Sequence, residues 1–275
     1  GYIYANAGEG ESTTDLVFGG HNIIAENGTI LKESGRYRNE IIYLEFDLER
    51  ITGERRKNTT FQTAKERSLI RVGFQIEKGE TSLTRTFPKK PFVPSDEQTR
   101  AARCEEILTI QAMGLKKRLA HTNARTAVVG ISGGLDSTLA LLVTARAFDM
   151  LGRDKKDIIA VTMPCFGTTD RTYQNACEMS KKVGATLIEV PIADAVNVHF
   201  RDIGHDPEDH SVTYENCQAR ERTQVLMDLA NKSGGMVIGT GDMSELALGW
   251  ATYNGDHMSM YGVNASVPKT LVRHL

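Results

Sequence analysis

The chain has 275 residues, of which 40% are hydrophobic and 25% are charged, and its 33 Lys and Arg against 35 Asp and Glu give a formal net charge of -2 at pH 7. This composition excludes a disordered or fibrous protein, and the balanced charge offers no broad positive surface to a nucleic-acid backbone. No apolar run approaches the roughly 18 residues of a membrane span, and the first residues lack the basic and apolar regions of a secretion signal. We therefore expect a cytoplasmic globular protein that binds neither nucleic acid nor a membrane.

The first 87 residues have the pattern of a β-rich segment. An Asn-Gly pair at 27–28 separates two β-type runs and predicts a hairpin of residues 21–25 and 29–33. Alternating apolar residues predict another strand over 41–48, and we interpret the charged stretch 49–57 as a solvated loop. Prolines in residues 88–95 disfavour helix and predict a linker between domains.

From residue 96 onward, predicted helices and strands alternate. A long helix is expected over 96–121, with Ser95 and Gln98 forming a capping box. The elements expected after it are strand 127–131, a helix from near 137 to 151, strand 158–163, helix 171–183, strand 186–190, helix 215–232 and strand 236–239. Buried strands that alternate with helices predict an α/β fold with a parallel, doubly wound sheet and flanking helices, in which ligands bind at the carboxyl ends of the strands.

Cysteine and histidine spacing does not favour a metal site. The four cysteines form no zinc-ligand pattern, and we expect free thiols; they are Cys104, Cys165, Cys177 and Cys217. His205 and His210 share neither a helix face nor a strand face, so we interpret the polar stretch around them as a loop that covers a substrate.

The loop Ser132-Gly133-Gly134-Leu135-Asp136-Ser137 is the clearest ligand-binding signal. Its glycines permit close approach of the backbone, and the N–H groups at the start of the following helix suit an anion such as pyrophosphate. Asp136 would repel a bare phosphate, which favours a Mg²⁺ ion between the carboxylate and phosphate oxygens. An ordinary glycine-rich turn with a serine cap is the alternative. The loop resembles the pyrophosphate loop of ATP pyrophosphatases, which cleave ATP between its α and β phosphates.

Motifs further along the chain narrow this resemblance to one family. Residues 214–222, 239–250, 252–256 and 264–270 resemble the synthetase domain of the glutamine-dependent NAD⁺ synthetases. Residues 4–8 and 11–15 resemble the carboxyl-terminal part of the nitrilase-like glutaminase domain in the same family. The resemblance implies a β-rich remnant of the nitrilase-like α/β domain over 1–87, a linker over 88–95, and over 96–275 a synthetase domain, like the adenine-nucleotide alpha-hydrolases, that is truncated at its carboxyl terminus.

The family resemblance also implies an activity. It implies ATP-dependent amidation of nicotinic acid adenine dinucleotide to NAD⁺ through an adenylated intermediate, with ammonia derived from glutamine in the full-length enzyme. ATP and Mg²⁺ are the implied cofactors, and a homo-oligomer is the implied assembly. The alternatives are another ATP pyrophosphatase, GMP-synthetase-like or tRNA-modifying, or a non-catalytic nucleotide-binding fragment. No cysteine matches the glutaminase nucleophile, so we expect a fragment without glutamine hydrolysis.

Residue roles follow from the resemblance by position. The implied ATP-binding residues are Ser132, Gly133, Gly134, Asp136, Ser137, Met163, Thr240 and Lys269. The implied dinucleotide-binding residues are Asn216, Arg220, Arg222 and Trp250, and the implied metal ligands are Asp136 and Glu245. Asp136, Lys269 and Asp256 are the implied catalytic residues. A purely structural role remains the alternative for some of these residues. Glu245 would then only begin a helix, Trp250 would only fill the core, and the two arginines would only form the solvated face of a helix.

Overall fold

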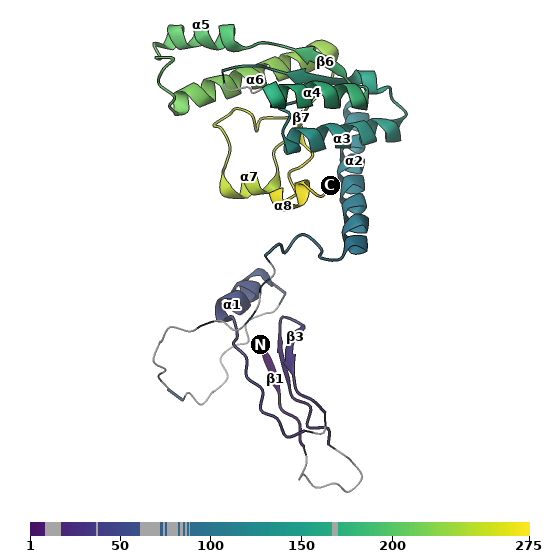
Figure 1. The fold of residues 1–275 in the computed structure, drawn as a ribbon, viewed down its shortest axis with the longest axis vertical. Coiled ribbons are helices and arrows are strands. Elements are labelled where there is room, and N and C mark those ends of the chain that lie inside the picture. Colours follow the sequence, from purple (N-terminus) through teal and green to yellow (C-terminus); the bar gives the residue numbers. More distant parts are fainter. Residues whose placement is uncertain are drawn as a thin grey trace. The chain divides into compact units, whose positions relative to one another are not determined.

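The computed structural model describes residues 1–8, 18–36, 38–60, 72–73, 75, 82, 85, 87, 89–166 and 170–275. The chain divides into two compact units, Gly1–Pro88 and Lys89–Leu275, and many of their elements are labelled in Figure 1. Residues 11–15, which carry part of the family resemblance, lie outside the described residues. Within the described ranges, no helix has both the length and the apolar character needed to cross a membrane.

The first unit contains a three-stranded antiparallel sheet of order β1-β2-β3. The predicted hairpin is confirmed as β2 (Ile23–Glu26) and β3 (Thr29–Glu33). Asn27 and Gly28 between them have φ values of 49° and 79°, as a tight hairpin turn requires. The sequence does not predict β1 (Tyr2–Tyr4), whose side chains are exposed.

The predicted strand over 41–48 is wrong. Two backbone groups of this segment bond to side chains, and the segment is not assigned to a strand. The Lys32 ammonium donates to the Tyr43 carbonyl at 3.1 Å, and the Asp47 N–H donates to the Glu26 carboxylate at 3.2 Å. Apolar alternation therefore reflects partial burial of an extended segment without strand pairing.

The predicted loop over 49–57 is also wrong, because this stretch forms α1 (Leu48–Lys57). Asp47 caps the helix by accepting a hydrogen bond from the Arg50 N–H at 2.9 Å. One glutamate in the first turn and three basic residues in the last turn complement the helix dipole. No residue of α1 is buried, which agrees with the solvated character predicted for the stretch.

The second unit is built on a five-stranded parallel sheet of order β6-β5-β4-β7-β8, which confirms the predicted fold class. The strands are β4 (Ala127–Gly130), β5 (Ile158–Thr162), β6 (Thr186–Glu189), β7 (Met236–Gly239) and β8 (Tyr261–Gly262). The chain runs from β4 outward to β6 and then crosses to the other side of β4 to form β7. The strand order thus reverses between β4 and β7, which is where open α/β sheets bind ligands.

Helices cover both faces of this sheet (Figure 1). The helices of this unit are α2 (Glu97–Thr122), α3 (Leu135–Leu151), α4 (Asp170–Val183), α5 (Ala193–Ile203), α6 (Val212–Ser233), α7 (Met243–Leu248) and α8 (Lys269–Val272), with a short 3₁₀ helix at Lys155–Asp157. Ala127 and Val129 of β4 face the core shared with α2, α3 and α4, whereas Val128 faces α6. This alternation explains why β4 is apolar at every position.

Two details of the second unit differ from the sequence prediction. Asp96, not Ser95, caps α2, and its side chain accepts a hydrogen bond from the Thr99 N–H at 2.6 Å. The sequence does not predict α5, α7, α8 or β8, most of which are very short.

Candidate functional site

The loop after β4 is closed by its own hydroxyl groups. The Ser132 and Ser137 hydroxyls lie 3.1 Å apart, and the Ser137 hydroxyl also donates to the Gly134 carbonyl at 3.1 Å. Gly133 has a φ of +79°, and a Cβ at this position would lie 2.1 Å from the Thr172 carbonyl oxygen. Among the described residues, no side chain caps the start of α3, so its first N–H groups are available to an anion.

The loop after β7, which begins with the half-buried Thr240, leads into α7 and supplies two carboxylates. Asp242 has 0% exposure, and one of its oxygens accepts hydrogen bonds from the N–H groups of Ser244 at 2.7 Å and Glu245 at 3.0 Å. The Glu245 side chain accepts in return from the Asp242 N–H at 3.4 Å, which completes a capping box. The capping geometry therefore holds both side chains at the same end of α7.

Asp136, Asp242 and Glu245 form a carboxylate cluster around Lys269. Each offers an oxygen that lies within 4.8 Å of those of the others. The Lys269 ammonium lies 2.5 Å from Asp136, 2.9 Å from Asp242 and 3.5 Å from Glu245. The cluster thus joins the loop after β4, the loop after β7 and α8, and it brings together both predicted metal ligands and a predicted catalytic lysine.

Mutual attraction keeps Lys269 and Asp242 charged. Burial works against the ammonium of Lys269, but its bonds to Asp136 and Asp242 outweigh burial and raise the lysine pKa above its ordinary range. Burial likewise works to raise the pKa of Asp242, but Lys269 and the backbone N–H groups of α7 hold this pKa below the usual carboxyl range. At neutral pH the cluster therefore contains an ammonium and at least one firmly ionised, buried carboxylate.

The carboxylate cluster fits a hard divalent cation. Its donors are all carboxylate oxygens, which Mg²⁺ prefers. Asp136 Oδ1 is buried and has no hydrogen-bond partner within the described part of the chain. Three carboxylates against one ammonium leave a formal excess of two negative charges, which a divalent cation would neutralise.

The predicted dinucleotide-binding residues of α6 hold the segment 253–256. Asn216 accepts a hydrogen bond from the Tyr253 N–H at 3.2 Å, and Arg220 Nε donates to the Tyr253 carbonyl at 3.2 Å. Arg222 donates to both Asp256 oxygens, at 2.7 and 2.6 Å. Burial opposes the charge of Arg222, but this pairing raises its pKa. The arginines are thus engaged by protein groups rather than merely solvated.

Trp250 and Met163 occupy different environments. Trp250 is 80% exposed, which argues against the alternative that it fills the core. Its backbone N–H donates to the Glu245 carbonyl at 2.9 Å, just beyond the C-cap Gly249 of α7, the helix that Asp242 caps and that carries Glu245. Met163 is half-buried at the carboxyl end of β5, and its methyl group would lie 3.6 Å from a Cβ added at Gly130.

The two histidines of the 205–210 stretch pack against different aromatic rings. The His205 ring packs against Phe200 with centroids 4.9 Å apart, and His210 stacks on Tyr214 at 4.5 Å. Neither belongs to the group of possible metal ligands found among the described residues.

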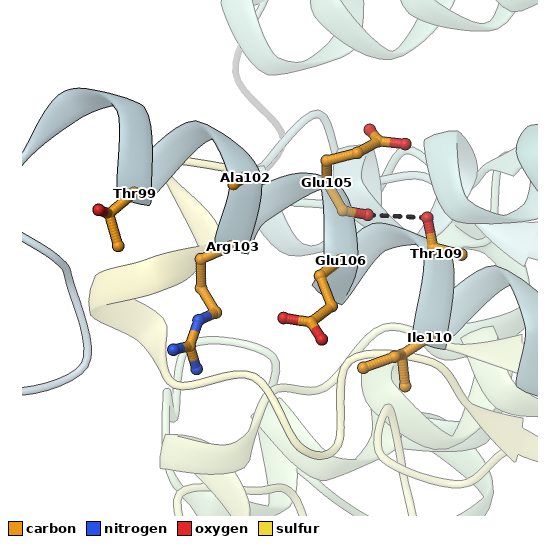
Figure 2. Close-up of a pocket in the computed structure, with 7 residues that line it drawn as sticks. All are labelled: Thr99, Ala102, Arg103, Glu105, Glu106, Thr109 and Ile110. Atoms are coloured by element: carbon orange, nitrogen blue, oxygen red, sulfur yellow. Dashed lines mark hydrogen bonds between the residues drawn. The ribbon is translucent and has the colours of Figure 1, made fainter.

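A surface pocket on α2 is unrelated to these groups (Figure 2). Its lining comes entirely from one helix and consists of Thr99, Ala102, Arg103, Glu105, Glu106, Thr109 and Ile110. Figure 2 shows these side chains spread along the helix rather than converging, with a single hydrogen bond between the Glu105 carbonyl and the Thr109 hydroxyl. None of the predicted site residues lines it.

Sequence reasoning missed Asp242. It lies in the stretch that carries the family resemblance, but no role is assigned to it. Asp at the start of an apolar run, followed by Glu three residues later, is a capping signal that could have identified its position. Its contact with Lys269 depends on tertiary structure and has no local signature.

Comparisons with known proteins agree on one family. The family profile described as NAD synthase matches residues 107–275. A glutamine-dependent NAD(+) synthetase of Mycobacterium leprae is 45% identical over 100% of this chain, and one of Mycobacterium tuberculosis is 43% identical over the same span. The chain spans only 42% and 43% of the lengths of these relatives.

Solved structures show the same fold. A glutamine-dependent NAD+ synthetase of Acinetobacter baumannii in complex with ADP has a TM-score of 0.57 at 24% identity. The alignment covers 98% of this chain and 43% of the Acinetobacter chain. An NH3-dependent NAD synthetase of Campylobacter jejuni has a TM-score of 0.55 at 23% identity. The alignment covers 62% of this chain and 70% of the Campylobacter chain.

Proposed function

Because this chain belongs to the NAD synthase family, we propose that the protein amidates nicotinic acid adenine dinucleotide to NAD⁺ at the expense of ATP. The observation that carries the proposal is the carboxylate cluster beside the 132–137 loop, at the reversal of strand order between β4 and β7. In this position phosphate donors and cation ligands come from neighbouring strand ends, which is the arrangement that binding a metal-bound triphosphate needs.

The 132–137 loop is proposed to bind the ATP phosphates. Its hydroxyls, its backbone N–H groups and the uncapped start of α3 are donors. Asp136, Asp242 and Glu245 would hold Mg²⁺, which supplies charge neutralisation for phosphate oxygens when bound. We assign Thr240 and Met163 to the same nucleotide, because they follow β7 and β5 at the same edge of the sheet.

The reaction takes two steps. The nicotinate carboxylate attacks the α-phosphorus of ATP, so that a carboxyl oxygen–phosphorus bond forms and the bond to pyrophosphate breaks. Ammonia then attacks the activated carbonyl carbon, AMP leaves with the carboxylate oxygen, and the nitrogen loses a proton. Lys269 is positioned to offset the charge that develops on the leaving pyrophosphate. In this proposal the rate acceleration comes from tight positioning of the reactants rather than from a covalent bond to the protein.

The acceptor side of the site is proposed to comprise Trp250 and the segment held by α6. An exposed tryptophan ring can stack on the nicotinate ring of the dinucleotide. Asp256 is proposed to face the ammonia, and Arg222 keeps its carboxylate in place. Asn216 and Arg220 support the same segment and are proposed to border the dinucleotide.

Residues 1–87 are proposed to be the carboxyl-terminal part of a nitrilase-like glutaminase domain that supplies the ammonia. The support is that the two kinds of solved structure align with different shares of this chain. The glutamine-dependent structure aligns with 98% of this chain, whereas the NH3-dependent structure aligns with 62%, and the NAD synthase profile begins only at residue 107.

An assay of ATP–pyrophosphate exchange tests the proposed function. Exchange should require Mg²⁺ and nicotinic acid adenine dinucleotide, and xanthosine monophosphate or tRNA should not substitute. Asp136→Asn should lower exchange at least tenfold while the protein stays folded, whereas Asp149→Asn, on the exposed end of the same helix, should not change it. Exchange with xanthosine monophosphate or tRNA in place of the dinucleotide would favour another ATP pyrophosphatase. ATP binding without any exchange would indicate a non-catalytic module.

A further inference from the structure

The side chain of Asn264 is fully buried and joins three segments of the second unit. Its amide nitrogen donates to the backbone carbonyls of Asp136 and Thr240, both at 3.0 Å. Its amide oxygen accepts from Gln111 Nε2 of α2 at 3.0 Å, and the same nitrogen of Gln111 donates to the Val263 carbonyl at 2.9 Å. Every polar atom of the Asn264 side chain is therefore engaged.

The Asp136 and Thr240 carbonyls belong to the two backbone segments that carry the carboxylate cluster. These segments are its two halves: Asp136 on one side, and the Asp242–Glu245 pair on the other. The Asp136 carbonyl lies in the first turn of α3, on the residue that contributes one carboxylate. The Thr240 carbonyl lies two residues before Asp242, in the loop that leads to Glu245 and so contributes the other two. A single amide group thus bridges the two backbone segments that carry the carboxylate cluster.

The backbone of Asn264 is itself firmly held. It follows β8 (Tyr261–Gly262), which pairs with β7, and the Val263 N–H donates to the Gly239 carbonyl at 3.3 Å. The Asn264 carbonyl accepts from the Val267 N–H at 2.9 Å and closes a turn. The bridge is therefore anchored on the sheet, whereas Lys269, which also links the two halves, does so through a long side chain that is 49% exposed.

We infer that Asn264 is a positioning residue that sets the distance between the Asp136 carboxylate and the Asp242–Glu245 pair, and thereby the affinity and geometry of the cation site. The inference rests on the proposed function, in which these three carboxylates hold Mg²⁺. Asparagine suits the position because one nitrogen supplies two donors and the oxygen accepts from Gln111. Serine could supply only one donor, and aspartate would turn a carboxylate toward two carbonyl oxygens.

Binding of Mn²⁺, used as a paramagnetic probe in place of Mg²⁺ and followed by electron paramagnetic resonance, tests the inference without turnover. Groups that orient metal ligands typically change metal affinity by about 10-fold to 100-fold when they are removed. We expect Asn264→Leu to weaken Mn²⁺ binding about tenfold and to lower kcat by a similar factor, while the KM for ATP changes less than about threefold. Asn264→Ser, which keeps one donor, should fall between Asn264→Leu and the unsubstituted protein.

Thr144→Val is the matched control. Thr144 is fully buried on α3, the helix that carries Asp136, and its hydroxyl donates to the Ala140 carbonyl at 2.7 Å. The substitution removes a buried hydrogen bond of the same kind away from the cluster, so it should lower stability but leave Mn²⁺ affinity and kcat within twofold.

Two outcomes separate this inference from the proposed function. Unchanged Mn²⁺ affinity and kcat in folded Asn264→Leu would overturn the inference while leaving the proposed function in place. If that variant does not fold, unchanged values in Asn264→Ser would overturn it equally. Absence of dinucleotide-dependent exchange in a protein that still binds Mn²⁺ would overturn the proposed function, and the affinities of the Asn264 variants would still decide the role of the residue.

Discussion

The Lys269 ammonium lies 2.5 Å from a carboxylate oxygen of Asp136, although 133 residues separate them in sequence. One residue lies at the start of α8 and the other at the start of α3, so the ion pair links the carboxyl-terminal helix to the loop after β4. The same ammonium contacts Asp242 and Glu245. Lys269 thus offsets one of the three negative charges of the carboxylate cluster.

Replacing Lys269 with methionine should slow turnover by about 10²-fold to 10³-fold, because a positive charge near the leaving pyrophosphate is lost. The three carboxylates would then repel one another, so Mg²⁺ should raise the melting temperature of the variant more than that of the unsubstituted protein. Steady-state kinetics and thermal unfolding with and without Mg²⁺ measure both effects. Lys155→Met is the control, because Lys155 pairs with Asp149 at 3.0 Å on the surface and should change neither quantity. A turnover rate within threefold in Lys269→Met would contradict the assigned role.

Gly133→Ala should abolish ATP binding and lower the free energy of unfolding by about 2 to 4 kcal/mol. A Cβ there would meet the Thr172 carbonyl at 2.1 Å in addition to straining a φ of +79°. Gly152→Ala is the matched control: its φ is +64°, but no atom of the described residues would lie within 4 Å of the added Cβ, so it should cost only about 1 kcal/mol and leave ATP affinity intact. Calorimetric titration measures the ATP affinity, and denaturant unfolding measures the free energy of unfolding. Equal losses of both quantities in the two variants would refute the steric argument.

Trp250→Ala should raise the KM for the dinucleotide about tenfold but alter stability by less than about 0.5 kcal/mol, because the side chain is 80% exposed. Trp250→Phe keeps an aromatic face and should restore much of the affinity. Trp250 is the only tryptophan in the chain, so its fluorescence reports binding directly. Fluorescence that does not respond to saturating dinucleotide would argue against stacking.

Acid should destabilise the first unit through Glu26. Burial acts to raise the pKa of this carboxyl, but Arg85, at 3.2 and 3.3 Å, and the Asp47 N–H together lower it below its ordinary value of 4.5. The folded state is therefore stabilised above pH 4.5, and this contribution is lost as the pH falls from there through the lowered pKa. Glu26→Gln should flatten the acid limb of a stability–pH curve. An unchanged acid limb in Glu26→Gln would assign the effect to other groups.

Much of the second unit could be predicted from sequence because its signals are local. Continuous apolar runs such as Ala127–Gly130 predict buried parallel strands, and all four longer strands lie close to their predicted bounds. The segment 41–57 was harder, because apolar alternation and charge describe exposure rather than pairing. In residues 41–47, the Tyr43 carbonyl and the Asp47 N–H bond to the side chains of Lys32 and Glu26, and these long-range contacts have no local sequence signal.

The site residues likewise fall into those with a local sequence signal and those defined by long-range contacts. The 132–137 loop and Glu245 carry recognisable patterns, whereas Asp242 and Asn264 act through contacts with Lys269, Asp136 and Thr240 that are remote in sequence. A capping signal marks Asp242 as a helix start but does not reveal its ion pair. Such roles emerge only when strand order brings the loops after β4 and β7 together.

Oxygen transfer tests the central claim most directly. Nicotinic acid adenine dinucleotide labelled with ¹⁸O in its carboxylate would be turned over with ATP, Mg²⁺ and ammonia, and the products examined by mass spectrometry. Attack of the carboxylate on the α-phosphorus predicts one ¹⁸O in AMP and none in pyrophosphate. Formation of ADP with ¹⁸O in inorganic phosphate would instead show attack at the γ-phosphorus and would contradict the mechanism assigned to the 132–137 loop and the carboxylate cluster.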